Sequence, residues 1–97
     1  MQDSSEKQIS VLLVDDHELV REGIARLLAD AADMTVIAQL ASGEEAVEYV
    51  TENPASSANA ADVILMDARM PGLGGIEATR AILKQCPNCK IVAMSTV

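Results

Sequence analysis

Short apolar runs punctuate this chain, and each has about the length of one buried β-strand. Between them lie longer stretches in which apolar residues recur every three to four positions, as they do on one face of an α-helix. The pattern therefore predicts strands that alternate with helices. The predicted strands span residues 9–14, 35–40, 63–66 and 91–94, and the predicted helices span residues 18–31, 42–52 and 76–85.

Two of the predicted helices are preceded by recognisable start signals. Residues 42–45 read SGEE, in which Ser42 can cap a helix while Glu45 reaches back to the backbone, as in a capping box. Before the last helix the chain reads ARMPGLGG, and its proline and glycines predict a sharp loop. Both signals support the element boundaries that the periodicity gives.

Strands that alternate with helices form parallel pairs joined by right-handed crossovers. We therefore expect an α/β fold built on a doubly wound parallel sheet. The composition agrees, because 49% of the residues are apolar but only 1% are aromatic, which leaves an aliphatic core typical of such sheets. We expect a single domain over residues 9–97, preceded by a flexible polar tail at residues 1–8.

The net charge of −8 narrows the possible partners. Binding to nucleic acid needs clustered Lys and Arg, and the seven basic residues here are scattered, so we expect no nucleic acid to bind this chain itself. No apolar run approaches the ~20 residues that span a bilayer, and the start of the chain lacks the features of a signal peptide. We expect a cytoplasmic protein without a membrane partner.

The two cysteines, Cys86 and Cys89, form a CPNC motif whose spacing is shared by redox sites and by half of a zinc site. A zinc site needs about four ligands, and the only histidine, His17, lies far away in the sequence. Redox motifs usually open a helix, whereas this motif follows one. We interpret the pair as two reduced thiols in a turn.

Carboxylates follow two of the predicted strands at the point where each strand ends. Asp15 and Asp16 come directly after the first strand, and Asp67 follows the third. Functional groups of open α/β sheets gather at the carboxyl ends of the strands, so we expect the three side chains to converge if these strands are neighbours. Their mutual repulsion calls for a cation, and a site of few oxygen ligands suits Mg²⁺.

Two other interpretations of these residues are weaker. Each Asp could cap the helix or loop that follows it, and for Asp16 alone this is as plausible as metal binding. Shared capping by all three would bring like charges together for little gain. A nucleotide-binding site is disfavoured, because the first turn reads DDHE and would repel a phosphate that a glycine-rich loop attracts.

Three segments closely resemble response regulator receiver domains of the LuxR/NarL/FixJ-type branch. They read VLLVDDHELVREGIARLL, VILMDARMPGLGGIEATR and IVAMST, and the resemblance extends over residues 9–97. It implies a flavodoxin-like receiver fold with strand order 2-1-3-4. Members of the family continue through a helix, a fifth strand that carries an essential lysine, a last helix and a DNA-binding domain, so the resemblance implies a receiver truncated after its fourth strand.

The resemblance also implies roles for individual residues. Asp67 would be the phosphoacceptor, and Asp16 and Asp67 would bind Mg²⁺ directly with the backbone carbonyl of Arg69, while Asp15 would act through water. Ser95 matches the hydroxyl switch position. The phosphoryl donor would be a sensor histidine kinase, so the chain would assist its own phosphorylation without being an enzyme.

Two functions therefore remain open at the level of sequence. The first is a phosphoacceptor module that controls transcription through a LuxR-type DNA-binding domain. The alternative is a non-phosphorylated dimerisation or interaction module, in which the exposed fourth strand, residues 91–94, pairs with a second copy. Aspartyl-phosphate hydrolases are disfavoured, because they normally carry a second Asp where this chain has Arg69.

Overall fold

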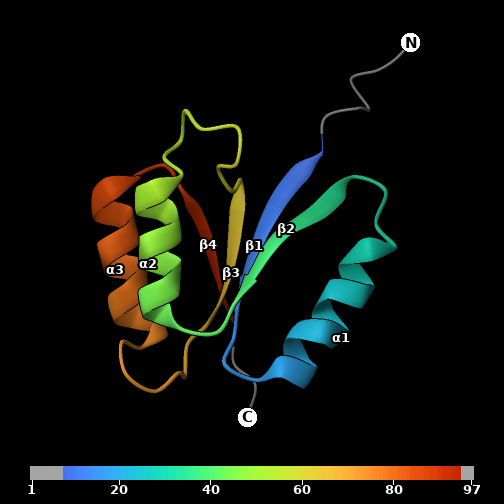
Figure 1. Cartoon of the computed structure of the whole chain (residues 1–97), viewed down its shortest axis with the longest axis horizontal. Helices are drawn as coiled ribbons and strands as arrows, with labels where there is room; N and C mark the ends of the chain where they lie inside the picture. Colours follow the sequence, from blue (N-terminus) through green and yellow to red (C-terminus); the bar gives the residue numbers. More distant parts are fainter. Residues whose placement is uncertain (1–7, 95–97) are drawn as a thin grey trace.

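The structure, a computed structural model, describes residues 8–94. A parallel four-stranded sheet forms the middle layer, with strand order β2-β1-β3-β4. Helix α1 covers one face and helices α2 and α3 cover the other (Figure 1). The elements are β1 (Ile9–Val14), α1 (Glu18–Ala29), β2 (Met34–Leu40), α2 (Gly43–Glu52), β3 (Val63–Asp67), α3 (Gly75–Gln85) and β4 (Lys90–Met94).

The doubly wound sheet, its parallel pairing and the order 2-1-3-4 are therefore confirmed. The boundaries differ by one or two residues, as is usual for such predictions. The largest error is at the end of the first helix, which stops at Ala29 rather than at residue 31. The N–H groups of Ala31 and Met34 instead bond to carbonyls three residues back, in turns that lead into β2.

The cap of α2 is largely as predicted. The N–H of Glu45 donates to the Ser42 hydroxyl at 3.1 Å. The Glu45 carboxylate accepts a hydrogen bond from the N–H of Ala41 at 3.2 Å, one residue before the expected Ser42. The two side chains thus still provide acceptors for backbone groups at the start of this helix.

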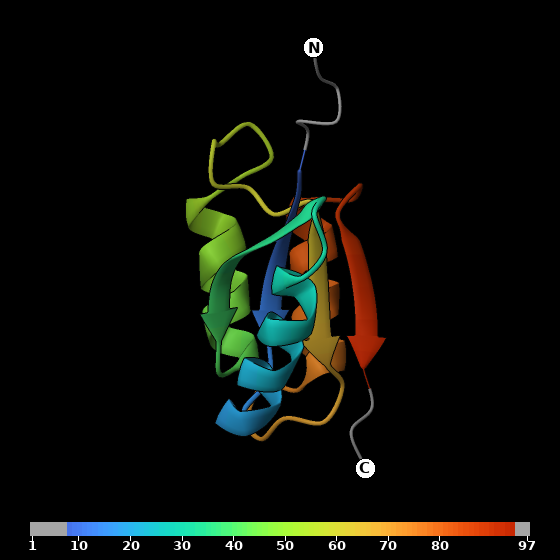
Figure 2. The same cartoon turned by 90° about the vertical axis from the view of Figure 1, so that its right-hand side faces the viewer.

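The hydrophobic core lies between the sheet and the α2/α3 layer. Alternate residues of β1 and β3 point into it, and the side chains packed there are aliphatic, as the composition predicts. Helix α1 lies against the opposite face (Figure 2). It covers this face more thinly, since it contains no fully buried residue and its Leu19 is 82% exposed. The buried core comprises Leu12, Val14, Ala46, Val50, Ile64, Met66, Met70, Ala78 and Ile82.

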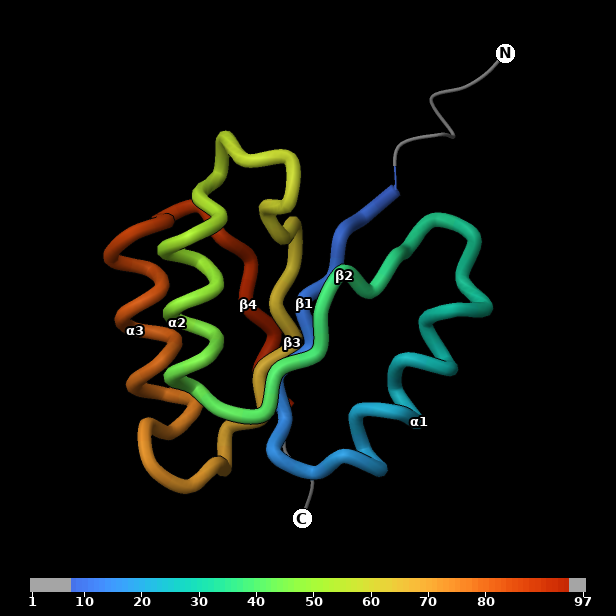
Figure 3. The backbone as a smooth tube through the Cα atoms, in the orientation of Figure 1, coloured from blue at the N-terminus to red at the C-terminus, as the bar shows by residue number. Residues whose placement is uncertain are grey.

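The register of the central strands brings the ends of β1 and β3 together. Val14 pairs with Met66, so the residues that follow them, Asp15 and Asp67, leave the sheet at the same edge. The backbone trace shows this edge at the bottom of the molecule, where the loops to α1 and α3 begin (Figure 3). Helix α3 starts very close to β3, because a Cβ at Gly75 would lie 2.3 Å from the Asp67 carbonyl oxygen.

This contact predicts that Gly75→Ala destabilises the protein by about 1–3 kcal/mol, because the backbones would have to separate. The matched control is Gly23→Ala in α1, where nothing lies within 4 Å of the new Cβ. That change should stabilise the fold by up to about 1 kcal/mol through helix propensity. Urea unfolding of both variants measures the difference, and equal effects at the two positions would contradict the packing argument.

Candidate functional site

Two carboxylates lie fully buried at the carboxyl ends of neighbouring strands. Asp67 is the last residue of β3 and Asp15 follows β1, and both side chains are 0% exposed. A carboxylate is rarely buried unless it is paired or binds a metal, because it loses its hydration. The convergence predicted from the strand ends is therefore present in the structure.

Each buried carboxylate has one satisfied oxygen and one without a partner. The Oδ1 of Asp15 accepts a hydrogen bond from the N–H of His17 at 2.8 Å, and the Oδ1 of Asp67 accepts one from the N–H of Arg69 at 3.0 Å. The Oδ2 atoms of both residues are buried and make no hydrogen bond within the described part of the chain. Such orphaned anionic oxygens are costly and indicate a site that can bind a cation.

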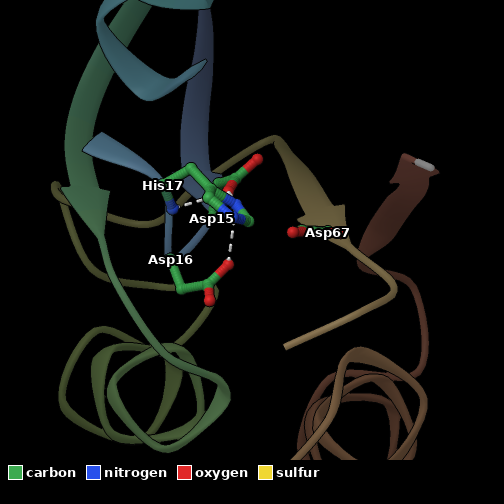
Figure 4. Close-up of side chains that lie close together, drawn as sticks. All are labelled: Asp15, Asp16, His17 and Asp67. Atoms are coloured by element: carbon green, nitrogen blue, oxygen red, sulfur yellow. Dashed lines mark hydrogen bonds and ion pairs between the residues drawn. The ribbon is translucent and has the colours of Figure 1, made fainter. Parts of the chain in front are cut away.

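Asp16 and His17 complete a cluster of four side chains around these oxygens. His17 Nδ1 lies 3.2 Å from Asp15 Oδ1 and 3.1 Å from Asp16 Oδ1. Each of the four residues offers one ligand atom, and these atoms all lie within 4.8 Å of one another. Figure 4 shows Asp15, Asp16 and His17 grouped together, with Asp67 approaching from β3.

The three carboxylates fit a magnesium ion. Mg²⁺ takes oxygen ligands at about 2.0–2.1 Å, so its opposite ligands lie about 4.2 Å apart, close to the spread of this cluster. The unpartnered oxygens of Asp15 and Asp67 are negatively charged and buried, as a hard cation requires. Asp15, Asp16 and Asp67 could therefore hold Mg²⁺, with water completing its coordination.

The capping interpretation explains only part of this arrangement. The N-cap of α1 is His17, not Asp16, and its side chain makes no capping hydrogen bond. Asp16 as a helix cap is therefore wrong. Asp15 and Asp67 do bind nearby backbone N–H groups, but each uses one oxygen for this and leaves the other free.

The structure tests the predicted roles of Arg69 and Ser95 only in part or not at all. Arg69 contributes its N–H to Asp67, and the inward direction of its carbonyl stays a prediction. Ser95 lies outside the described residues. One contact was missed from the sequence: the Arg21 guanidinium donates to the backbone carbonyl of Asp15. The only available signal was a basic residue in the first turn of the helix that follows the acid pair.

The CPNC motif forms a turn far from this cluster along the chain. The N–H of Cys89 donates to the Cys86 carbonyl at 3.0 Å, and both cysteines are free thiols, as predicted. Burial raises the pKa of Cys89 to about 11, helped by the charge of Cys86 and a hydrogen bond to it. A thiol with this pKa is a poor nucleophile near neutral pH.

The family profile of the response regulator receiver domain matches residues 11–97. The chain belongs to this family. Curated relatives include the response regulator GacA of Pseudomonas viridiflava, 48% identical over 90% of this chain, and UvrY of Escherichia coli K12, 47% identical over the same share. The match covers 38% of the length of GacA and 37% of UvrY, so this receiver chain spans little more than a third of these proteins.

Solved structures agree with the assignment of the receiver fold. A LuxR-family response regulator from Aurantimonas superposes with a TM-score of 0.81 at 34% identity, over 94% of this chain and 61% of that one. The response regulator domain of Thermotoga maritima CheB superposes with a TM-score of 0.80 at 35% identity, over 92% of this chain and 61% of that one.

No helix among residues 8–94 is long and apolar enough to cross a membrane.

Proposed function

We propose that this receiver accepts a phosphoryl group on Asp67 from the phosphohistidine of a sensor histidine kinase, with Mg²⁺ bound beside it. The single observation that carries the proposal is the buried Asp67 carboxylate. Its Oδ1 is fixed by the Arg69 N–H, and its Oδ2, which has no hydrogen-bond partner within residues 8–94, belongs to the cluster formed with Asp15 and Asp16. The receiver would act in the cytoplasm and control transcription through a LuxR-type DNA-binding domain elsewhere in the protein.

In this reaction an oxygen of Asp67 attacks phosphorus as the bond from phosphorus to the donor histidine breaks. Asp15, Asp16 and Asp67 would hold Mg²⁺ with the Arg69 carbonyl, and the bound ion would neutralise charge on the phosphoryl oxygens. Asp67 is the residue of the three that matches the family's acceptor position. The Arg69 N–H orients its carboxylate, and the close approach of Gly75 fixes its backbone.

The metal site predicts that Mg²⁺ raises the melting temperature, because a ligand that binds only the folded state stabilises it by RT ln(1 + [L]/Kd). Asp16→Ala should abolish most of this gain. Asp30→Ala is the matched control, since Asp30 is an exposed acid at the far end of α1. Thermal unfolding with and without Mg²⁺ tests this, and an equal gain in the Asp16 and Asp30 variants would exclude the site.

The phosphoacceptor role predicts that acetyl phosphate and Mg²⁺ add one acid-stable, base-labile phosphoryl group per chain. Asp67→Asn should reduce labelling by at least about 100-fold, because the amide cannot act as the nucleophile. Intact-mass spectrometry after short incubation measures the labelled fraction. Labelling of the Asp67→Asn protein at the wild-type rate would refute Asp67 as the acceptor.

We also propose a second function, dimerisation through β4, as the alternative favoured by one observation. Within the described residues β4 pairs only with β3, and its Val92 side chain is 50% exposed. Within residues 8–94 the outer edge of β4 has no strand partner, and its N–H and C=O groups could bond to another strand. In a symmetric dimer of these 97 residues the two β4 edges would pair with each other.

Val92→Lys should weaken such a dimer, because symmetric pairing would bring two ammonium groups into one interface. Each pair of like charges across two strands costs about 0.2–1 kcal/mol of binding free energy. Leu27→Lys is the control, since Leu27 is 74% exposed on α1, away from β4. Sedimentation velocity over a dilution series measures the association. A wild-type protein that stays monomeric at high concentration would rule out this interface.

A further inference from the structure

The only histidine of the chain, His17, points into the acidic cluster. Its backbone is fixed as the N-cap of α1 by the N–H bond to Asp15 Oδ1. Its imidazole makes no capping hydrogen bond, so the helix does not need it. The ring is nevertheless directed at the carboxylates (Figure 4), although 61% of the side chain remains exposed.

The spacing of the ring nitrogen matches that of a metal ligand. Bonds of about 2.1 Å place neighbouring ligands of an octahedral ion about 3.0 Å apart. His17 Nδ1 lies 3.2 Å from Asp15 Oδ1 and 3.1 Å from Asp16 Oδ1. The nitrogen therefore lies from each of the two oxygens at the separation expected for adjacent ligands around one ion.

Hydrogen bonding of the imidazole to Asp15 and Asp16 leaves part of the cluster unexplained. The imidazole approaches the Oδ1 atoms of Asp15 and Asp16, whereas the Oδ2 atoms of Asp15 and Asp67 are buried and have no hydrogen-bond partner among residues 8–94. These oxygens belong to side chains that are 0% exposed. An ion between the four residues would bind the ring nitrogen together with Asp16 Oδ1 and these two Oδ2 atoms, the carboxylate oxygens that accept no hydrogen bond among the described residues.

We propose that His17 Nδ1 is a ligand of this site and shifts its preference from Mg²⁺ towards divalent transition metals that bind imidazole, such as Co²⁺. The inference rests on the metal site of the proposed function. Mg²⁺ takes oxygen ligands, so a nitrogen contributes little to its affinity. Co²⁺ binds imidazole readily and lies higher in the order of divalent affinities, so the same nitrogen strengthens its binding. As a ligand, Nδ1 would present its lone pair to the ion while Nε2 carries the ring proton.

The test compares Mg²⁺ and Co²⁺ binding by isothermal titration calorimetry at one fixed pH. The protein carries no histidine tag, so that His17 is its only imidazole. All samples also carry Cys86→Ser and Cys89→Ser, because thiols bind soft metals and lie in a separate turn. The key variant is His17→Asn, whose amide oxygen falls near the position of Nδ1, and His17→Ala removes the ligand altogether.

The expected result is a fall in Co²⁺ affinity of at least about tenfold in both His17 variants, as for other losses around metal sites. Mg²⁺ affinity should change by less than about twofold in His17→Asn. Asp16→Ala should weaken the binding of both ions, as expected if they occupy the same site. Circular dichroism checks the fold of each variant, and the exposure of the His17 side chain makes it tolerant of substitution.

Two results would overturn the inference while leaving the proposed function intact. Equal losses of Mg²⁺ and Co²⁺ affinity in His17→Asn would mean that His17 only positions Asp15 and Asp16. Unchanged affinity for both ions would mean that the imidazole does not reach the metal. If neither ion binds the starting protein, the magnesium site of the proposed function fails as well.

Discussion

The site depends on one constraint, the parallel register between β1 and β3. Because Val14 pairs with Met66, the next residue on each strand leaves the sheet at the same level, and two buried carboxylates face one pocket. A shift of one residue in this register would turn one carboxylate to the other face of the sheet. The aliphatic core beneath holds the register, since Val14 and Met66 are both packed in it. The β1/β3 pair thus fixes both the packing of the core side chains and the positions of the two carboxylates.

The loop from β3 to α3 is held in place from the neighbouring helix. The N–H of Leu73 donates to the Glu44 carboxylate of α2 at 3.2 Å, and Gly72 adopts a positive φ of 71° beside it. Met70 anchors the same loop in the core, with 8% of its side chain exposed. These contacts keep Arg69, whose N–H orients the Asp67 carboxylate, at a defined place. The glycines and the proline predict a loop here. The sequence does not predict its contact with Glu44, because the two segments are far apart along the chain.

Features that follow from the pattern along the chain could be predicted from the sequence, whereas the direction of individual side chains in the folded loops could not. The alternation of strands and helices follows from periodicity, and the strand order from the resemblance to receiver domains. Once β1 and β3 are neighbours, the meeting of Asp15 with Asp67 follows from the ends of parallel strands. The orientation of His17 does not, because its ring direction depends on the loop between β1 and α1. The end of α1 was also misjudged, since no Gly or Pro marks it and Asp30 serves as its C-cap.

The two faces of the sheet are attached in different ways, and this bears on how the site can act on the fold. Helices α2 and α3 pack through buried side chains, whereas α1 contributes no fully buried residue. At its start α1 is joined to the site by polar contacts, from the His17 N–H to Asp15 Oδ1 and from the Arg21 guanidinium to the Asp15 carbonyl. The strength of polar contacts depends on nearby charge, while apolar packing does not. A change of charge at the acidic cluster would therefore act on these polar contacts, and on that of the Arg69 N–H with Asp67, rather than on the apolar packing of the helices.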